Sequence, residues 1–178
     1  SPARYARSSC HMTGWYDTSK TAGEFIRAEG QFRNRVTADG TSGYPAEADR
    51  YHLYVSLACP WAHRTLILRT LKKIEDVISI SVVNPVIIEG GWALRDGFSD
   101  TVNGFDFLRQ AYTHANPDYT GRVSVPVLWD KQTKRIVNNE SAEIIRMLNS
   151  EFNALTPVKT DFYPEALHQE IDAINAFV

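Results

Sequence analysis

Hydrophobic and polar positions alternate along two short runs of the chain, residues 51–56 and residues 77–83, which are rich in aromatic or β-branched side chains. Such alternation predicts half-buried strands. Between these runs, residues 60–72 carry apolar side chains at helical spacing, which predicts a helix. A strand, a helix and a second strand at this spacing form a βαβ unit whose two strands run parallel.

A later apolar run is interrupted by a proline. Residues 123–129 are β-prone, but Pro126 within them has no N–H to donate to a sheet ladder. We therefore expect the strand to begin at this proline, with a cis peptide bond before it that leaves the preceding backbone open for pairing with a ligand. A turn at residues 130–133 then leads into a returning strand at residues 135–137.

A further amphipathic helix and a long connection complete the pattern. Residues 138–141 offer a helix start, and residues 142–148 place their apolar side chains on one side. The connection 84–122 contains one possible helix, at residues 105–112. A βαβ unit followed by two strands and a helix predicts an α/β fold over residues 51–150, with a four-stranded mixed sheet and helices on its faces.

The two ends of the chain differ from this central part. Residues 1–12 are small, basic and aperiodic, and we expect a tag or a disordered segment there. Residues 13–50 are polar and glycine-rich, which predicts an extended arm with at most a short helical turn near residues 22–28. We expect the arm to be anchored by single aromatic side chains: Trp15, Tyr16, Phe25, Phe32 and Tyr44. Residues 151–178 keep a helical apolar stripe to the last residue, so we expect a linker and the first helix of an all-α domain that continues further.

Composition narrows the class of protein. Hydrophobic residues make up 43% and charged residues 22% of the 178 residues, which suits one globular domain with or without a fragment of another. The net charge of -2 without a basic run argues against a nucleic-acid partner, and no apolar stretch is long enough to span a membrane. Two cysteines, Cys10 and Cys59, are too few for a disulfide framework, so we expect a reducing, cytoplasmic location.

The candidate reactive group is Cys59, which follows the first predicted strand and precedes the first predicted helix. Pro60 fits the first helical turn, so the cysteine lies at the helix mouth, where free N–H groups and the helix dipole favour a thiolate. A dithiol motif would place a second cysteine at position 62, which is alanine. A disulfide of Cys59 must then be resolved by an external thiol. The alternative is that Cys59 is one more small buried apolar residue, as most free cysteines are.

Several motifs resemble a known family. The order of elements, the Cys-Pro at the first helix, the Val-Pro before the third strand and the Glu-Ser at the third helix resemble the thioredoxin-like, glutathione-binding domain of glutathione transferases. More closely, six segments resemble the glutathionyl-hydroquinone reductases, the xi class of that superfamily: residues 59–64, 91–92, 121–122, 124–130, 139–146 and 171–175. The resemblance implies a thioredoxin-like fold, glutathione as co-substrate, no metal cofactor and a homodimer.

The resemblance also implies roles for individual residues. Cys59 is the implied nucleophile. The backbone of Val125, ahead of Pro126, would pair with the cysteinyl part of glutathione like an added strand. Glu140 would hold the ammonium of the γ-glutamyl end, and Ser141, with the N–H groups of its helix, would hold the carboxylate.

Two further positions are less constrained by their surroundings. Arg122 is the candidate for the glycyl carboxylate of glutathione, and Trp92 for the wall beside it. Each has a structural alternative: Trp92 could fill the core, Arg122 could be a solvated charge, and Ser141 could simply cap its helix. His63 is expected to be a packing or surface residue, and spacing does not give the direction of Trp61.

The implied reaction is the glutathione-dependent reduction of glutathionyl-hydroquinones to hydroquinones through a Cys59–glutathione mixed disulfide. A related alternative is an omega-like cysteine transferase that acts on protein mixed disulfides or on dehydroascorbate. A third possibility is a non-enzymatic interaction protein that uses the same fold. The sequence alone leaves these three hypotheses open.

Overall fold

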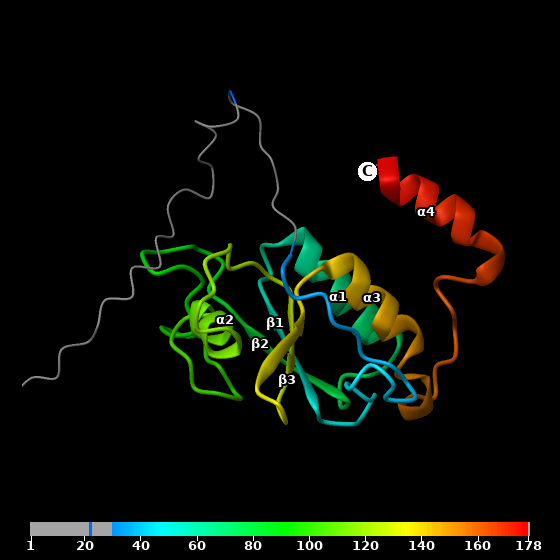
Figure 1. Ribbon diagram of the computed structural model, residues 1–178, viewed down its shortest axis with the longest axis horizontal. Helices are drawn as coiled ribbons and strands as arrows, with labels where there is room; N and C mark the ends of the chain where they lie inside the picture. Colours follow the sequence, from blue (N-terminus) through cyan, green and yellow to red (C-terminus); the bar gives the residue numbers. More distant parts are fainter. Residues whose placement is uncertain (1–21, 23–29, 178) are drawn as a thin grey trace, which may run out of the picture.

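The computed structural model describes residue 22 and residues 30–177, and these contain one four-stranded mixed sheet (Figure 1). Its strands are β1 (Tyr51–Val55), β2 (Ile78–Val82), β3 (Val127–Asp130) and β4 (Arg135–Asn138), in the spatial order β2-β1-β3-β4. β1 and β2 are parallel, and β3 is antiparallel to both β1 and β4. The predicted α/β class, the strand order along the chain and the mixed sheet are confirmed.

Helices cover both faces of the sheet. The covering helices are α1 (Pro60–Leu71), α2 (Arg109–Ala115) and α3 (Ser141–Ser150); the described residues also form α4 (His168–Phe177) and short 3₁₀ turns at Asn153–Leu155 and Glu165–Leu167. In Figure 1, α1 and α3 pack side by side on one face, and α2 lies on the other. β1 and β3 are buried at every position because both of their faces are covered.

The third strand begins where the proline predicts. The Val125–Pro126 peptide bond is cis, and β3 starts at the next residue, Val127. The third helix also begins within the predicted region, at Ser141, but its N-cap is Glu140, whose side chain accepts a hydrogen bond from the Ala142 amide. Ser141 itself is therefore not the cap of this helix.

The helix in the long connection starts later than the predicted residues 105–112. Residues 106–108 pair instead with residues 92–94, since Leu94 donates to the Asp106 carbonyl and Leu108 donates to the Trp92 carbonyl. Backbone that is paired in this way cannot join a helix, so α2 begins at Arg109. This is a long-range contact that helical periodicity does not show.

The described part of the arm, residues 30–50, lies against the sheet and α3. Phe32 packs on Tyr112 at a ring-centroid distance of 5.7 Å, and Tyr44 packs against the core. The backbone also contributes, because the Asn34 amide donates to the Val137 carbonyl of β4. Anchoring therefore uses main-chain pairing as well as single aromatic side chains.

The C-terminal helix forms where the apolar stripe predicts it. α4 stands apart from the sheet in Figure 1, and its stripe is exposed, with Ile174 at 64% and Phe177 at 92% exposure. Asp172 of α4 pairs with Arg146 of α3 at 3.3 Å. The division into an arm, a central domain and an all-α start stays a prediction, and residues 1–21, 23–29 and 178 lie outside the described residues.

Two absences hold for the described part of the chain. None of its helices has the length and apolarity needed to cross a bilayer. Nor do the described His, Cys, Asp and Glu side chains form a group of three or more that could bind a metal ion.

A histidine is buried within the sheet. His52 of β1 is fully buried, and its two ring nitrogens lie 2.7 Å from the Ser79 hydroxyl and 2.9 Å from the Ser81 hydroxyl, both on β2. Burial lowers the pKa of His52 from 6.5 to about 4; the positive charges of Lys131 and Arg69 act in the same direction, and Asp100 opposes them.

We expect His52 to make folding pH-dependent. Its depressed folded-state pKa means that the unfolded chain binds a proton between pH 6.5 and about 4, so this stability is present above pH 6.5 and is lost as the pH falls. Relative to pH 7, the loss at pH 4.5 is about 2 kcal/mol. His52→Gln cannot titrate and should show a correspondingly smaller loss in urea unfolding. Equal losses in the two proteins would contradict the expectation.

Candidate active site

The loop between β1 and α1 presents Cys59. The Ser56 hydroxyl accepts a hydrogen bond from the Ala58 amide at 3.3 Å, and the Ser56 carbonyl accepts one from the Cys59 amide at 3.2 Å. Cys59 is extended and is the N-cap of α1, with Pro60 in the first helical turn, as the sequence predicts. The side chain is half-buried, so its sulfur is placed at a helix N-terminus without being sealed in the core.

The sulfur lies beside the residue that precedes the cis proline. Cys59 Sγ is 3.7 Å from the carbonyl oxygen of Val125. The Val125 amide has no hydrogen-bond partner among residues 30–177. The backbone amide of Val125, next to the thiol, is therefore a candidate for strand-like pairing with a peptide.

A buried tyrosine holds two of the predicted segments together. The Tyr112 hydroxyl donates to the Ser124 carbonyl at 2.8 Å and accepts from the Ser124 amide at 3.2 Å and from the Asn139 side chain at 3.3 Å. Burial raises the pKa of Tyr112, so the phenol stays protonated at neutral pH. Tyr112 thus links the Ser124 backbone, just before Val125, to the side chain of Asn139, just before Glu140.

Glu140 and Ser141 lie at the start of α3, where α1 packs against it. Ser141 is 1% exposed, and its hydroxyl accepts hydrogen bonds from Arg64 of α1 through Nε at 3.0 Å and Nη2 at 2.7 Å. Glu140 lies 3.8 Å from the same guanidinium. The structure thus brings Cys59 and Val125 together, and it joins Glu140 and Ser141 to the cysteine's helix through Arg64.

The other two predicted residues are placed by different contacts. Trp92 is 6% exposed and belongs to the core cluster, with its carbonyl accepting from the Leu108 amide. Arg122 is exposed, three residues before Val125, and its carbonyl accepts from the Tyr119 hydroxyl at 2.5 Å. Their roles in binding glutathione stay predictions.

Two neighbours of Cys59 in α1, Trp61 and His63, are exposed. Trp61 is 43% exposed, and the Arg64 guanidinium lies 5.0 Å from its ring centroid. His63 is exposed, as a surface histidine should be. The sequence reasoning gave no role to Arg64 or Tyr112. One signal was available for Arg64: it lies four residues before Leu68, so both are on the helix face that meets α3.

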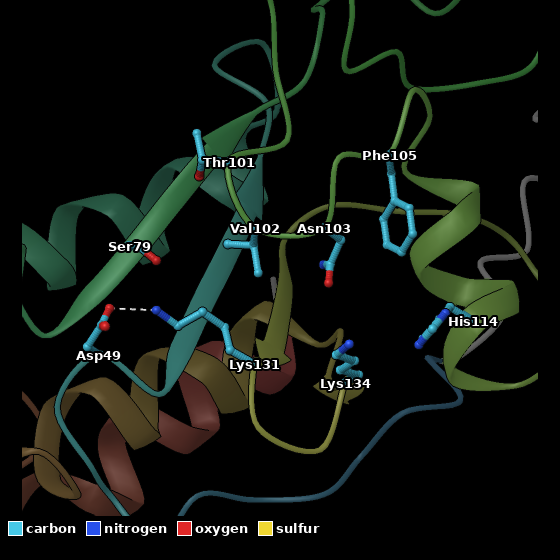
Figure 2. Close-up of a pocket in the computed structure, with 9 residues that line it drawn as sticks. All are labelled: Asp49, Ser79, Thr101, Val102, Asn103, Phe105, His114, Lys131 and Lys134. Atoms are coloured by element: carbon cyan, nitrogen blue, oxygen red, sulfur yellow. Dashed lines mark hydrogen bonds and ion pairs between the residues drawn. The ribbon is translucent and has the colours of Figure 1, made fainter.

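A separate hollow of about 670 Å³ lies near the opposite end of β1 (Figure 2). Its lining comes from the start of the sheet, the loop before α2, the end of α2 and the turn between β3 and β4. Lys131 in this lining is paired with Asp49 at 2.5 Å, the ion pair drawn in Figure 2. The lining has no nucleophilic thiol, so this hollow does not compete with the Cys59 region as a site for sulfur chemistry.

Comparison with known proteins identifies the class. Residues 58–151, more than half of the chain, match the family model described as glutathione S-transferase, N-terminal domain. The chain therefore belongs to the glutathione S-transferase family.

Within this family the chain is similar to glutathionyl-hydroquinone reductases. It is 56% identical to the reductase YqjG of Escherichia coli (strain K12) over 92% of this chain and 53% of that protein. It is 51% identical to the reductase PcpF of Sphingobium chlorophenolicum over 92% of this chain and 52% of that protein. The chain thus spans about half the length of the curated relatives it matches.

Solved structures give the same relationship. The glutathione-bound structure of YqjG matches with a TM-score of 0.79, covering 84% of this chain and 52% of that one. The glutathione S-transferase Xi of Phanerochaete chrysosporium, 47% identical, matches with a TM-score of 0.81, covering 86% of this chain and 54% of that one. The thioredoxin-like transferase fold and the likeness to the xi class are confirmed.

Proposed function

We propose that this protein reduces glutathionyl-hydroquinones to hydroquinones with glutathione, and that Cys59 is the nucleophile. The observation that carries the proposal is the position of Cys59 Sγ, at the N-terminus of α1 and 3.7 Å from the Val125 carbonyl. A peptide paired with the Val125 backbone would lie alongside this sulfur. The likeness to two proteins named glutathionyl-hydroquinone reductases supports the choice of substrate.

Each proposed binding residue contacts a different part of glutathione. Val125 would pair with the cysteinyl backbone through its amide and carbonyl. Ser141 and the first N–H groups of α3 would hold the γ-glutamyl carboxylate, and Glu140 would accept from the ammonium. Arg122 is proposed for the glycyl carboxylate and Trp92 for the adjacent wall.

The chemistry needs one protein thiol. The Cys59 thiolate attacks the glutathionyl sulfur; the S–S bond forms, the sulfur–ring bond breaks, and the ring carbon takes a proton from solvent. The ring is thereby reduced by two electrons, and the two sulfurs are oxidised to a mixed disulfide. A second glutathione thiolate then attacks the glutathione sulfur of that disulfide, which releases glutathione disulfide and regenerates Cys59.

The test is a turnover assay. The full-length protein is incubated with glutathione and glutathionyl-benzohydroquinone, and we expect hydroquinone and glutathione disulfide to appear in equal amounts. Dehydroascorbate and a protein–glutathione mixed disulfide serve as comparison substrates. No hydroquinone release would refute the proposal, and faster turnover of either comparison substrate would assign the chain to the omega-like alternative instead.

Location and assembly complete the proposal. Resolution of Cys59 by external glutathione requires a compartment in which reduced glutathione is abundant, which supports the cytoplasm. We also propose a homodimer, as the resemblance to the xi class implies. Sedimentation velocity of the purified protein tests this assembly.

A further inference from the structure

Arg64 connects the helix of the nucleophile to the proposed γ-glutamyl site. It lies in the second turn of α1 and reaches the first residue of α3, 77 positions later in the chain. Its Nε and Nη2 atoms both donate to the Ser141 hydroxyl oxygen, at 3.0 Å and 2.7 Å. Arginine is charged at every accessible pH, so these two donors are permanent.

The two hydrogen bonds decide what the Ser141 hydroxyl can do. A serine hydroxyl has two acceptor lone pairs and one donor proton. Two N–H groups of Arg64 already donate to this oxygen, and Ser141 as a residue is 1% exposed, so water has little access to the hydroxyl proton. Ser141 is therefore left able only to donate, and a donor suits a carboxylate and repels an ammonium.

Glu140 has the opposite character. Its carboxylate only accepts, and it already accepts from the Ala142 amide at 3.3 Å. Ser141 can thus donate a hydrogen bond to a ligand, and the neighbouring Glu140 can accept one. The γ-glutamyl end of glutathione carries one carboxylate and one ammonium, so only one orientation satisfies both residues: the carboxylate on Ser141 and the ammonium on Glu140.

Arg64 also has the support needed for a fixed position. Its guanidinium lies 5.0 Å from the Trp61 ring and 3.8 Å from Glu140, and its side chain is 27% exposed. It is thus packed between the first turn of α1 and the first residues of α3. Its contacts couple the segment that carries Cys59 to the segment proposed to hold the ligand.

We propose that Arg64 is a positioning residue that makes Ser141 a dedicated donor, and that it thereby gives the site its selectivity for γ-glutamyl thiols over thiols that lack this group. The inference rests on the proposed function in one respect, that glutathione binds beside Cys59. It adds the residue that sets which thiols are accepted.

The test compares binding of two unreactive ligands, S-methylglutathione and S-methyl-cysteinylglycine, which lacks the γ-glutamyl group. Calorimetry gives the ratio of the two dissociation constants. We expect the unaltered protein to favour S-methylglutathione and Arg64→Met to lose about tenfold of that preference, as expected for a charged hydrogen bond. Binding of S-methyl-cysteinylglycine should change by less than about twofold, because that ligand does not reach Ser141.

Matched variants separate positioning from structure. Arg69→Met is the control, since Arg69 lies on the same helix and donates to the Ile78 carbonyl at 2.6 Å, and it should keep the preference. Arg64→Lys keeps the charge but not the two-pronged geometry, and it should restore only part of the preference. In a Ser141→Ala background, Arg64→Met should cost little more, because the two residues act together.

The outcomes are distinct. Equal weakening of both ligands by Arg64→Met would mean a structural role and would overturn the inference, as would an unchanged preference in Arg64→Met and Arg64→Lys. The inference would also be overturned if the unaltered protein bound S-methylglutathione no more tightly than S-methyl-cysteinylglycine. Neither ligand reacts with Cys59, so selective binding without turnover would refute the proposed function and leave the inference standing.

Discussion

Cys59→Ser is expected to lower kcat/KM for a glutathionyl-hydroquinone by at least about 10³-fold, in line with the loss of other catalytic nucleophiles. Serine has nearly the same size, but its hydroxyl is scarcely ionised at neutral pH and cannot form the mixed disulfide. Measurement of hydroquinone release and of the mass added by one glutathione to the protein checks both parts of the step. Retention of more than a tenth of the activity would contradict the assignment.

Two control measurements on Cys59→Ser are its stability and its affinity for an unreactive glutathione analogue. Cys59 is half-buried, and its described polar contact is the weak one with the Val125 carbonyl, so little stability depends on it. Cys59→Ser should therefore unfold at the same urea concentration and bind S-methylglutathione as before. A loss of binding in parallel with activity would indicate a disturbed site instead of a missing nucleophile.

Asp130→Ala is expected to destabilise the fold by about 3 kcal/mol, because it removes the buried carboxylate that pairs with Arg50 and leaves this buried arginine only the more exposed Glu47, at 3.3 Å. Asp130 is fully buried and accepts from Arg50 Nε at 3.1 Å and from Nη2 at 2.8 Å. Burial by itself would raise the pKa of Asp130, but Arg50 and hydrogen bonds from Gln132 and Thr133 lower it overall. Urea unfolding at neutral pH, where this carboxylate is ionised in both states, measures the loss.

Two further variants test the cause. Asp49→Asn removes the charge that pairs with Lys131 and keeps a residue type that tolerates the positive φ of position 49; because the Asp49 side chain is 82% exposed, no measurable change is expected. The double variant Arg50→Met with Asp130→Leu should recover much of the loss, since it removes both charges and keeps apolar volume. A small effect of Asp130→Ala, comparable to that of Asp49→Asn, would show that the buried pair contributes little.

Local signals in the sequence predicted the elements and part of the site. The Cys-Pro pair marked the start of α1, and Pro126 marked the start of β3, because each proline restricts the backbone next to it. Alternation gave the first two strands to within a residue at each end. These features depend on residues that are close together in the chain, so they can be predicted from the sequence alone.

The missed features all depend on residues far apart in the chain. The Arg64–Ser141 contact spans 77 positions and the Arg50–Asp130 pair spans 80. The identity of an arginine in the sequence does not indicate which distant residue it will contact. α2 begins later than the periodicity predicts because residues 106–108 pair with residues 92–94. The positions of Trp92 and Arg122 depend on the same long connection, where few periodic signals constrain the path.

The two ends of β1 carry different features of the protein. The buried Arg50–Asp130 pair lies at one end of this five-residue strand, and the loop that carries Cys59 leaves from the other. Because the length of the strand separates the two ends, substitutions in the loop should alter the surroundings of Cys59 without weakening the ion pair at the start of the sheet. Evolution or engineering could therefore vary the loop, and with it the compounds that react with Cys59, while the sheet keeps its stability.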